Sequence, residues 1–263
     1  MLLLLHFFAL GLYSLAAALA LAPYAGLRAP PRAWGVAVAT TGALAHAVAV
    51  AQLPPIGLAP ALSMLALFLV LLQVGSELLL HASAVALFTA PLAAGLVGLA
   101  LLSGLAPGAE PVAGGNAWFV LHVTLSVFGL ALLALAFVSA ALYLLQFREL
   151  KSKRFGHVFQ LFPPLERLDR LNQVALVAGF PTLTLGVLLA VGYAQRYAGW
   201  HVDPAQVVWG SFTWVVLGWA VWVRVVRHWG GRRAAFASIA GFAAVVLVYV
   251  ALKLAAPGTE RFL

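Results

Sequence analysis

The sequence predicts an all-α, polytopic membrane protein, a bundle of about eight transmembrane helices. The chain is 64% hydrophobic and only 8% charged, which is too little charge for the surface of a soluble domain of 263 residues. Long apolar runs recur throughout, each able to cross ~30 Å of hydrocarbon as a helix rising about 1.5 Å per residue. The runs are continuously apolar rather than alternating, so helices are the only plausible spanning elements.

Prolines and loop residues separate the runs. The first run ends before Pro23, and because nothing charged precedes Arg28 we interpret it as a retained span rather than a cleaved signal peptide. The fifth run is too long for a simple span and is expected to continue into the cytoplasm as an exposed helix ending near residues 148–151. Pro91 and Pro181 fall inside spans. The predicted spans are residues 2–22, 33–52, 58–76, 79–105, 117–147, 172–195, 207–226 and 234–256.

The basic residues predict the orientation of these spans. With the N-terminus outside, twelve of the fifteen lysines and arginines fall on one side, which satisfies the positive-inside rule. Both termini are therefore expected on the outer, periplasmic face of a bacterial inner membrane. The net charge of +8 does not predict a nucleic-acid partner, because these residues flank spans. The twelve are Arg28, Arg32, Arg148, Lys151, Lys153, Arg154, Arg167, Arg170, Arg224, Arg227, Arg232 and Arg233.

We expect one transmembrane domain over residues 1–263, without a separate soluble domain. Residues 148–171 mix basic side chains with Phe155 and Phe159, which predicts a cytoplasmic amphipathic connector. Such a segment is drawn to anionic lipid at the inner membrane face, or it docks a cytoplasmic partner.

Three histidines lie within the apolar runs at a similar predicted depth. His6, His46 and His122 each fall ~6–10 Å below the outer boundary, from a rise of about 1.5 Å per residue. Two imidazoles at one depth on different helices suit the axial positions of a b-type haem. The alternative for each is a hydrogen bond to a neighbouring helix. The chain has no cysteine, so covalent haem attachment to it and thiolate ligation are excluded.

An aromatic outer loop is expected at residues 196–208. It carries Trp200, His201 and Asp203, and the following span carries Trp214 at mid-depth. A flat aromatic lining suits a macrocycle, although helix packing explains Trp214 equally well. Asp203 precedes a proline. It therefore either belongs to the binding site or caps the N-terminus of the next helix.

Several stretches together resemble a known family. They are LHVTLSVFGLALLALAFVSAALYLLQ at 121–146, PPLERLDRL at 163–171, GFPTLTLG at 179–186, DP at 203–204, TW at 213–214 and HWGGRRAAFASIAGF at 228–242. In this order and spacing they look like the cytochrome c assembly family, in its CcsA-like and HemX-like branch of haem-handling membrane proteins. The resemblance is nearest to the short YpjD-like members. It covers the second half of the chain strongly and the first half weakly, with LAHAVAV at 44–50 its best point there.

The resemblance implies haem transport or presentation at the outer face. His122 matches the histidine that opens the fifth span, His46 matches the second-span histidine of the short branch, and Trp200 and Asp203 match positions of a tryptophan-rich outer motif. The motif is degenerate, since its first and third tryptophans fall at Arg196 and Val202. At most two of the four histidine positions of a full haem channel remain.

The sequence therefore predicts a haem-binding inner-membrane protein that holds non-covalent haem b between His46 and His122, with Trp200, Asp203 and Trp214 around it. Other membrane proteins of cytochrome assembly are the expected partners. No nucleophile–base pair, carboxylate cluster or phosphate loop indicates an enzyme. Two alternatives remain: a haem-free accessory or scaffold subunit that binds another membrane protein, and a small-molecule transporter.

Overall fold

Eight long helices carry the described part of the chain, which in this computed structural model comprises residues 1–54, 57–105, 117–152, 162–196 and 204–255. All eight are long and apolar enough to cross a membrane, so the predicted all-α, multi-pass class is confirmed. The helices are α1 (Leu2–Leu21), α2 (Arg32–Val50), α3 (Leu58–Leu80), α4 (Ala86–Leu102), α5 (Ala117–Ser152), α7 (Leu165–Arg196), α8 (Pro204–Val225) and α9 (Gly231–Ala255), with short 3-10 helices at Ala22–Ala25 and Ser83–Val85.

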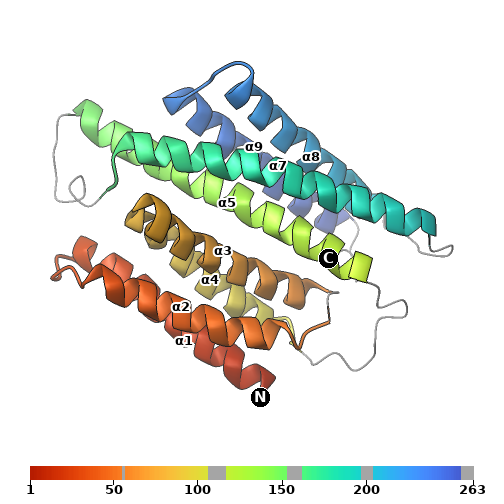
Figure 1. Ribbon diagram of the computed structural model, residues 1–263, viewed down its shortest axis with the longest axis horizontal. Helices are drawn as coiled ribbons and strands as arrows, with labels where there is room; N and C mark the ends of the chain where they lie inside the picture. Colours follow the sequence, from red (N-terminus) through yellow and green to blue (C-terminus); the bar gives the residue numbers. More distant parts are fainter. Residues whose placement is uncertain (55–56, 106–116, 153–161, 197–203, 256–263) are drawn as a thin grey trace.

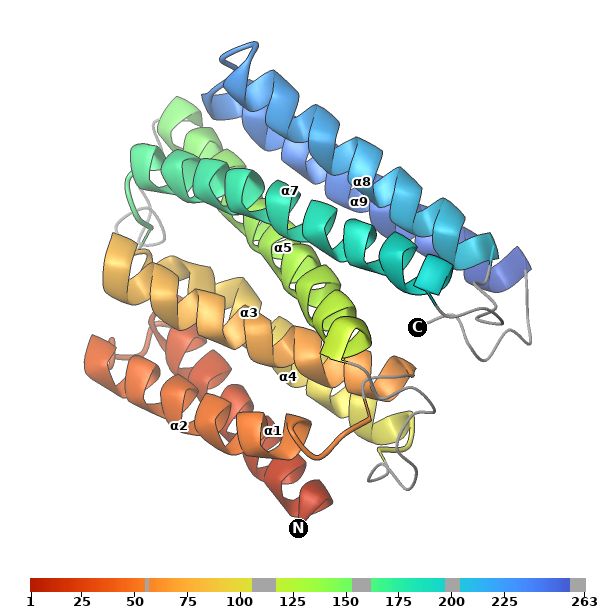
Figure 2. The same ribbon diagram turned by 45° about the vertical axis from the view of Figure 1, so that its right-hand side comes forward.

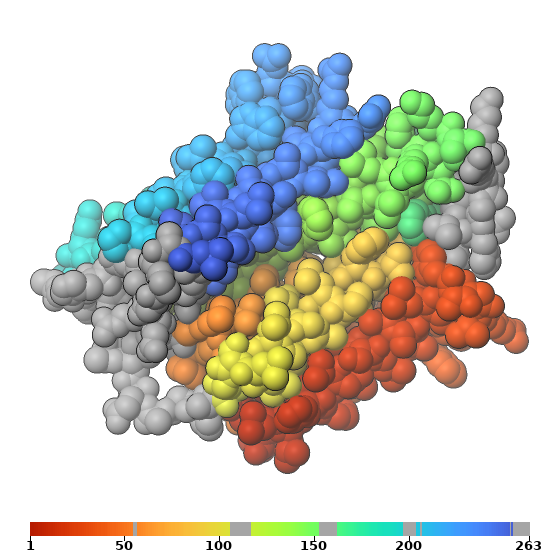
Figure 3. Space-filling model, turned by 180° about the vertical axis from the view of Figure 1, so that it is seen from behind, coloured from red at the N-terminus to blue at the C-terminus, as the bar shows by residue number. Residues whose placement is uncertain are grey.

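The helices form two groups that meet along α3 and α5. In the first group, α1 packs on α2 and α4, and α3 packs on the same two helices. In the second group, α5 packs on α7 and α9, and α8 packs on α7 and α9. On the back face, α9, α4 and α1 follow one another across the surface (Figure 3). Because α3 lies between α2 and α5, side chains at one depth on those two helices are not automatically neighbours (Figures 1 and 2).

Small residues bring α5 and α7 into close contact. A Cβ atom added at Gly129 would lie 3.2 Å from Leu183 Cβ, and one added at Gly179 would lie 3.3 Å from Leu132 Cβ. At Gly186 an added Cβ would lie 2.7 Å from Ser126 Oγ. Without a hydrophobic drive between helices in lipid, such close backbone approach is the usual source of their association.

Two helices extend beyond the apolar runs. The fifth run continues as a helix to Ser152, as predicted, while its placement in the cytoplasm stays a prediction. The sixth span begins earlier than predicted, because α7 starts at Leu165 and not near residue 172. Its first turns, LERLDRL, are too charged to register as apolar, but apart from Asp169 they consist of good helix formers.

Basic side chains gather at one end of the bundle, which we call the basic end. It is formed by the end of α1, the start of α2, the ends of α3, α5 and α8, and the starts of α7 and α9 (Figure 1). The described helix-flanking residues there are Arg28, Arg32, Arg148, Lys151, Arg167, Arg170, Arg224, Arg227, Arg232 and Arg233. The start of α1 and the end of α9 lie at the opposite end (Figure 2).

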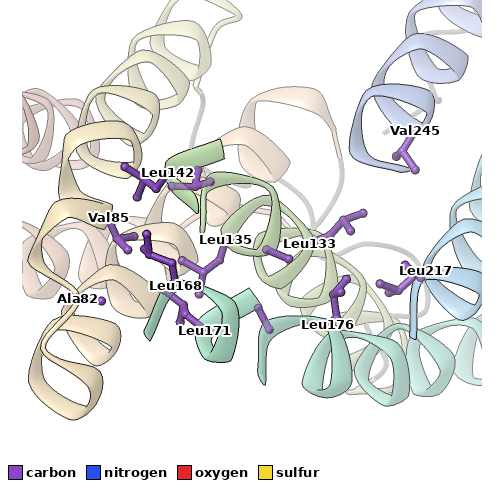
Figure 4. Close-up of a cluster of buried hydrophobic side chains, with 14 of the residues drawn as sticks. Ala82, Val85, Leu133, Leu135, Leu142, Leu168, Leu171, Leu176, Leu217 and Val245 are labelled. Carbon is purple, nitrogen blue, oxygen red and sulfur yellow. The ribbon is translucent and has the colours of Figure 1, made fainter. Parts of the chain in front are cut away.

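A buried cluster and an ion pair fix the C-terminal helices at the basic end. Leucines of α5 and α7 interdigitate there, and Ala82 and Val85 pack on them from the turn between α3 and α4 (Figure 4). Beside this cluster, Arg224 Nη1 and Nη2 donate to the two carboxylate oxygens of Asp169 at 2.8 and 2.7 Å. The backbone N–H of Gly231 also donates to Asp169, at 2.9 Å. One carboxylate on α7 thereby holds the end of α8 and the start of α9.

Candidate functional site

His122 lies in the second turn of α5, at the end opposite the basic end. Its Nδ1 lies 2.7 Å from the carbonyl oxygen of Gly186 on α7. A carbonyl only accepts, so Nδ1 carries the proton and donates, which leaves a lone pair on Nε2. No described residue is hydrogen-bonded to Nε2, and the ring is half-buried beside Phe119, at a centroid distance of 6.3 Å. The side chain is therefore oriented by its backbone partner and has one nitrogen available to a ligand.

His46 lies in different surroundings, wholly buried between α1, α2 and α3. Its Nε2 lies 2.8 Å from Ser63 Oγ, and its Nδ1 lies 3.1 Å from the hydroxyl of Tyr13. Ser63 Oγ also lies 2.9 Å from Nε2 of His6. The other ring nitrogen of His6, Nδ1, lies 3.0 Å from the carbonyl oxygen of Leu2. The two imidazole rings meet edge to face with centroids 5.2 Å apart.

These contacts form a chain of hydrogen bonds whose donors can be assigned. The Leu2 carbonyl only accepts, so in neutral His6 the proton is on Nδ1, and Nε2 accepts from the Ser63 hydroxyl. Ser63 then has only acceptor capacity left, so His46 donates to it through Nε2. His46 Nδ1 accepts in turn from Tyr13. All four bonds are satisfied with both histidines neutral, and every donor points toward the start of α1.

The structure does not bring His46 and His122 together. His46 is surrounded by Tyr13, Ser63 and His6, whereas His122 contacts α7, and α3 lies between their helices. Within the described part of the chain, no contact joins the two histidines. The predicted placement of one haem between them is therefore replaced by two separate environments. Among the described residues, His46 has partners at both ring nitrogens, whereas His122 has none at Nε2.

The aromatic residues predicted around the site are only partly described. Trp214 lies on α8 with 37% of its surface exposed. Its indole N–H donates to Thr184 Oγ1 at 2.9 Å, and its ring lies 5.6 Å from that of Phe180. No contact joins it to His122 among the described residues. Trp200 and Asp203 lie outside the described residues, so their predicted roles stay predictions.

Sequence reasoning missed the partners that distinguish the two histidines. Ser63 and Tyr13 had a detectable signal, since Ser63 is an isolated polar group in an apolar run and Tyr13 follows His6 by seven residues, two helical turns. Gly186 had none, because the group that holds His122 is a backbone carbonyl.

Ser63→Ala is expected to lower the free energy of unfolding by about 1–2 kcal/mol, because two buried hydrogen bonds disappear and membrane hydrogen bonds are individually modest. Thermal melting in detergent, followed by tryptophan fluorescence, measures this. Ser139→Ala is the matched control, since the described hydrogen bonds of buried Ser139 run to carbonyls of its own helix. Equal effects of the two substitutions would contradict a role for the hydrogen-bonded chain in holding α1 to α3.

Comparison with known proteins places the chain. The family model described as "Cytochrome C assembly protein" matches residues 55–259, most of the chain. The chain belongs to this family.

Three proteins named "Cytochrome c biogenesis protein CcsA" are similar to it. The one from Guillardia theta is 26% identical over 162 residues, 55% of this chain and 54% of the relative. The one from Chlamydomonas reinhardtii is 27% identical over 149 residues, 55% of this chain and 40% of the relative. The one from Trichormus variabilis is 31% identical over 99 residues, 37% of this chain and 28% of the relative.

Membership of the cytochrome c assembly family also separates the two histidine environments. The alignments span about half or less of the length of these curated relatives. The matched segment, residues 55–259, contains His122 and Gly186, whereas His6, Tyr13 and His46 precede it. The family resemblance therefore bears on the His122 site more directly than on His6, Tyr13 and His46, since only Ser63 of their hydrogen-bonded chain lies in the matched segment.

The two environments differ in how well they suit haem, the group that this family suggests. A metal-ligating histidine usually donates its other ring N–H to a carboxylate or backbone carbonyl, which is the arrangement of His122. His46 does not suit it, because both ring nitrogens are engaged and the side chain is 0% exposed. No described residue lies in contact with His122 as a second histidine, so the described residues at this position would offer a haem one axial ligand.

Proposed function

We propose that this protein works in cytochrome c assembly by holding haem b non-covalently through Nε2 of His122. The proposal makes it a multi-pass protein of the bacterial inner membrane, with the haem near the periplasmic face. Haem is then either cargo to be handed on or a fixed group. When bound, it supplies the iron centre that cytochrome assembly must deliver.

One observation carries the proposal: the hydrogen bond from His122 Nδ1 to the Gly186 carbonyl, at 2.7 Å. It sets the tautomer in which Nε2 has a lone pair and fixes the direction in which that lone pair points. The narrow approach of α5 to α7 at Gly186 keeps the carbonyl within reach, since a Cβ there would meet Ser126 Oγ at 2.7 Å. The role of His122 is to bind, and that of Gly186 is to orient it.

The side of the membrane follows from charge. The basic end of the bundle is the cytoplasmic end by the positive-inside rule, so the opposite end, where His122 lies, is periplasmic. Trp200 and Asp203, which follow α7 at that same end, are proposed to lie near the exposed edge of the haem. Partners of cytochrome assembly would approach from this side.

The first test is a reduced-minus-oxidised visible spectrum of the purified protein, with haem content measured against protein. We expect a b-type haem signal, either as purified or after titration with haemin to saturation at one site per chain. A spectrum that shows only free haemin after haemin is added, and no b-type signal, would overturn the proposal. That result would favour the alternative, a haem-free accessory subunit, which co-purification of a membrane-protein partner would then test.

A further inference from the structure

A small pocket at the basic end of the bundle lies far from His122. It lies where the end of α3 meets the first turns of α7, and its cavity volume is about 220 Å³. Its lining is Leu79, Leu80, His81, Arg167 and Arg170. Because one water occupies about 30 Å³ of liquid, this is room for several waters and therefore for a phosphate group. The pocket combines positively charged hydrogen-bond donors with apolar side chains.

The fold holds the wall of this pocket in place. His81 ends α3 in the left-handed conformation, with φ of 55°, which histidine tolerates better than most residues. Its N–H donates to Glu77 O at 3.1 Å, and that of Ala82 donates to Ser76 O at 3.3 Å. These bonds satisfy the Glu77 and Ser76 carbonyls and fix the turn that carries His81.

The opposite wall is the charged face of the first turns of α7. Leu168 and Leu171, which follow the two arginines in sequence, are buried in the cluster that also contains Leu142 and Val85 (Figure 4). This packing leaves Arg167 and Arg170 exposed toward the pocket. The two guanidinium groups are thus carried by turns that the core fixes.

Neither arginine has an acidic partner among the described residues. The one described ion pair joins Asp169 to Arg224. Glu77, one turn before His81, forms no described ion pair with either arginine. Glu166, one turn before Arg170, is exposed and forms no described ion pair with it. Two unpaired guanidinium groups and an imidazole around one concavity make an anion site, for which forked guanidinium donors are well suited.

The apolar part of the lining indicates what carries the anion. Leu79 lines the pocket with 80% of its surface exposed, and neighbouring Leu78 is 60% exposed. Leucines this exposed at the end of a membrane span suit acyl chains. Basic pockets between transmembrane helices at the cytoplasmic side are recurrent sites for anionic lipid headgroups. We infer that this pocket binds a phosphate group, supplied by the headgroup of an anionic lipid whose chains lie along Leu78 and Leu79.

The test compares melting temperatures of the purified protein in neutral detergent with added ligand. The ligands are short-chain phosphatidylglycerol, phosphatidylcholine of the same chain length, and inorganic phosphate. The pocket variant is Arg167→Gln/Arg170→Gln. The matched control is Arg148→Gln/Arg233→Gln, which removes the same charge from exposed positions at the same end. Melting without ligand checks that each variant is folded.

Phosphatidylglycerol is expected to stabilise the native chain and the control variant, with an apparent affinity about thirtyfold weaker in the pocket variant, since each basic residue contributes about a factor of five. Phosphatidylcholine is expected to have no comparable effect. A pocket-dependent response to phosphatidylglycerol alone assigns the phosphate to a lipid, whereas an equal response to inorganic phosphate assigns the site to free phosphate. Equal responses of the two double variants would overturn the site.

Discussion

His122→Ala is expected to weaken haem binding by more than about 100-fold, because changes even to the outer-shell partners of a metal ligand cost about 10–100-fold in affinity. Of the described histidines His6, His46 and His122, the substitution removes the one whose ring has a nitrogen without a described partner. The measurement is haemin titration of the purified variant, with haem content expressed per folded protein. Added imidazole should restore part of the binding, since it supplies the missing nitrogen without repairing anything else.

His46→Ala is the informative comparison. It should retain haem per folded protein while lowering stability, because His46 is engaged by Ser63 and Tyr13. His228→Asn is a further control at the basic end, where asparagine tolerates the positive φ of 52°. Equal loss of haem in His46→Ala and His122→Ala would mean that the helices rearrange to bring the two histidines together, against the arrangement described above. Loss in all three variants would indicate general misfolding.

The fold was more predictable than the site because the two depend on different information. Hydropathy locates helices along the membrane normal. Eight spans and the common depth of His6 and His46 could therefore be predicted from the positions of residues along the sequence. Which helices are lateral neighbours depends on side-chain packing. The same depth therefore suggested a His46–His122 pair, although α3 lies between their helices.

Two further features lay outside what the apolar pattern can indicate. The early start of α7 at Leu165 depends on helix propensity and on Leu168 and Leu171 reaching a core beyond the apolar run. The orientation of His122 depends on a backbone carbonyl exposed by the absence of a side chain at Gly186. Sequence indicates that a histidine is present, whereas the proton on its Nδ1 follows only from the three-dimensional neighbour.

Asp169→Ala is expected to lower the free energy of unfolding by about 3 kcal/mol, the low end of the range for breaking a buried ion pair. Arg224 has only 4% of its side chain exposed and would be left without its counter-charge, whereas Asp169 is 29% exposed, which limits the loss. The Gly231 N–H would lose its acceptor as well. Thermal unfolding in detergent, followed by tryptophan fluorescence, measures the change.

Two comparisons separate the ion pair from a general effect of charge on α7. Glu166→Ala removes an exposed acid from the same turns and should change stability by less than about 0.5 kcal/mol, as surface substitutions usually do. Asp169→Leu/Arg224→Leu should recover most of the lost stability, since apolar replacement of both partners leaves no charge uncompensated. If the double variant were as unstable as Asp169→Ala, the cost would lie in the lost bond to Gly231 and not in the stranded guanidinium. In that case the junction of α8 and α9, rather than the charge on α8, would be what Asp169 holds.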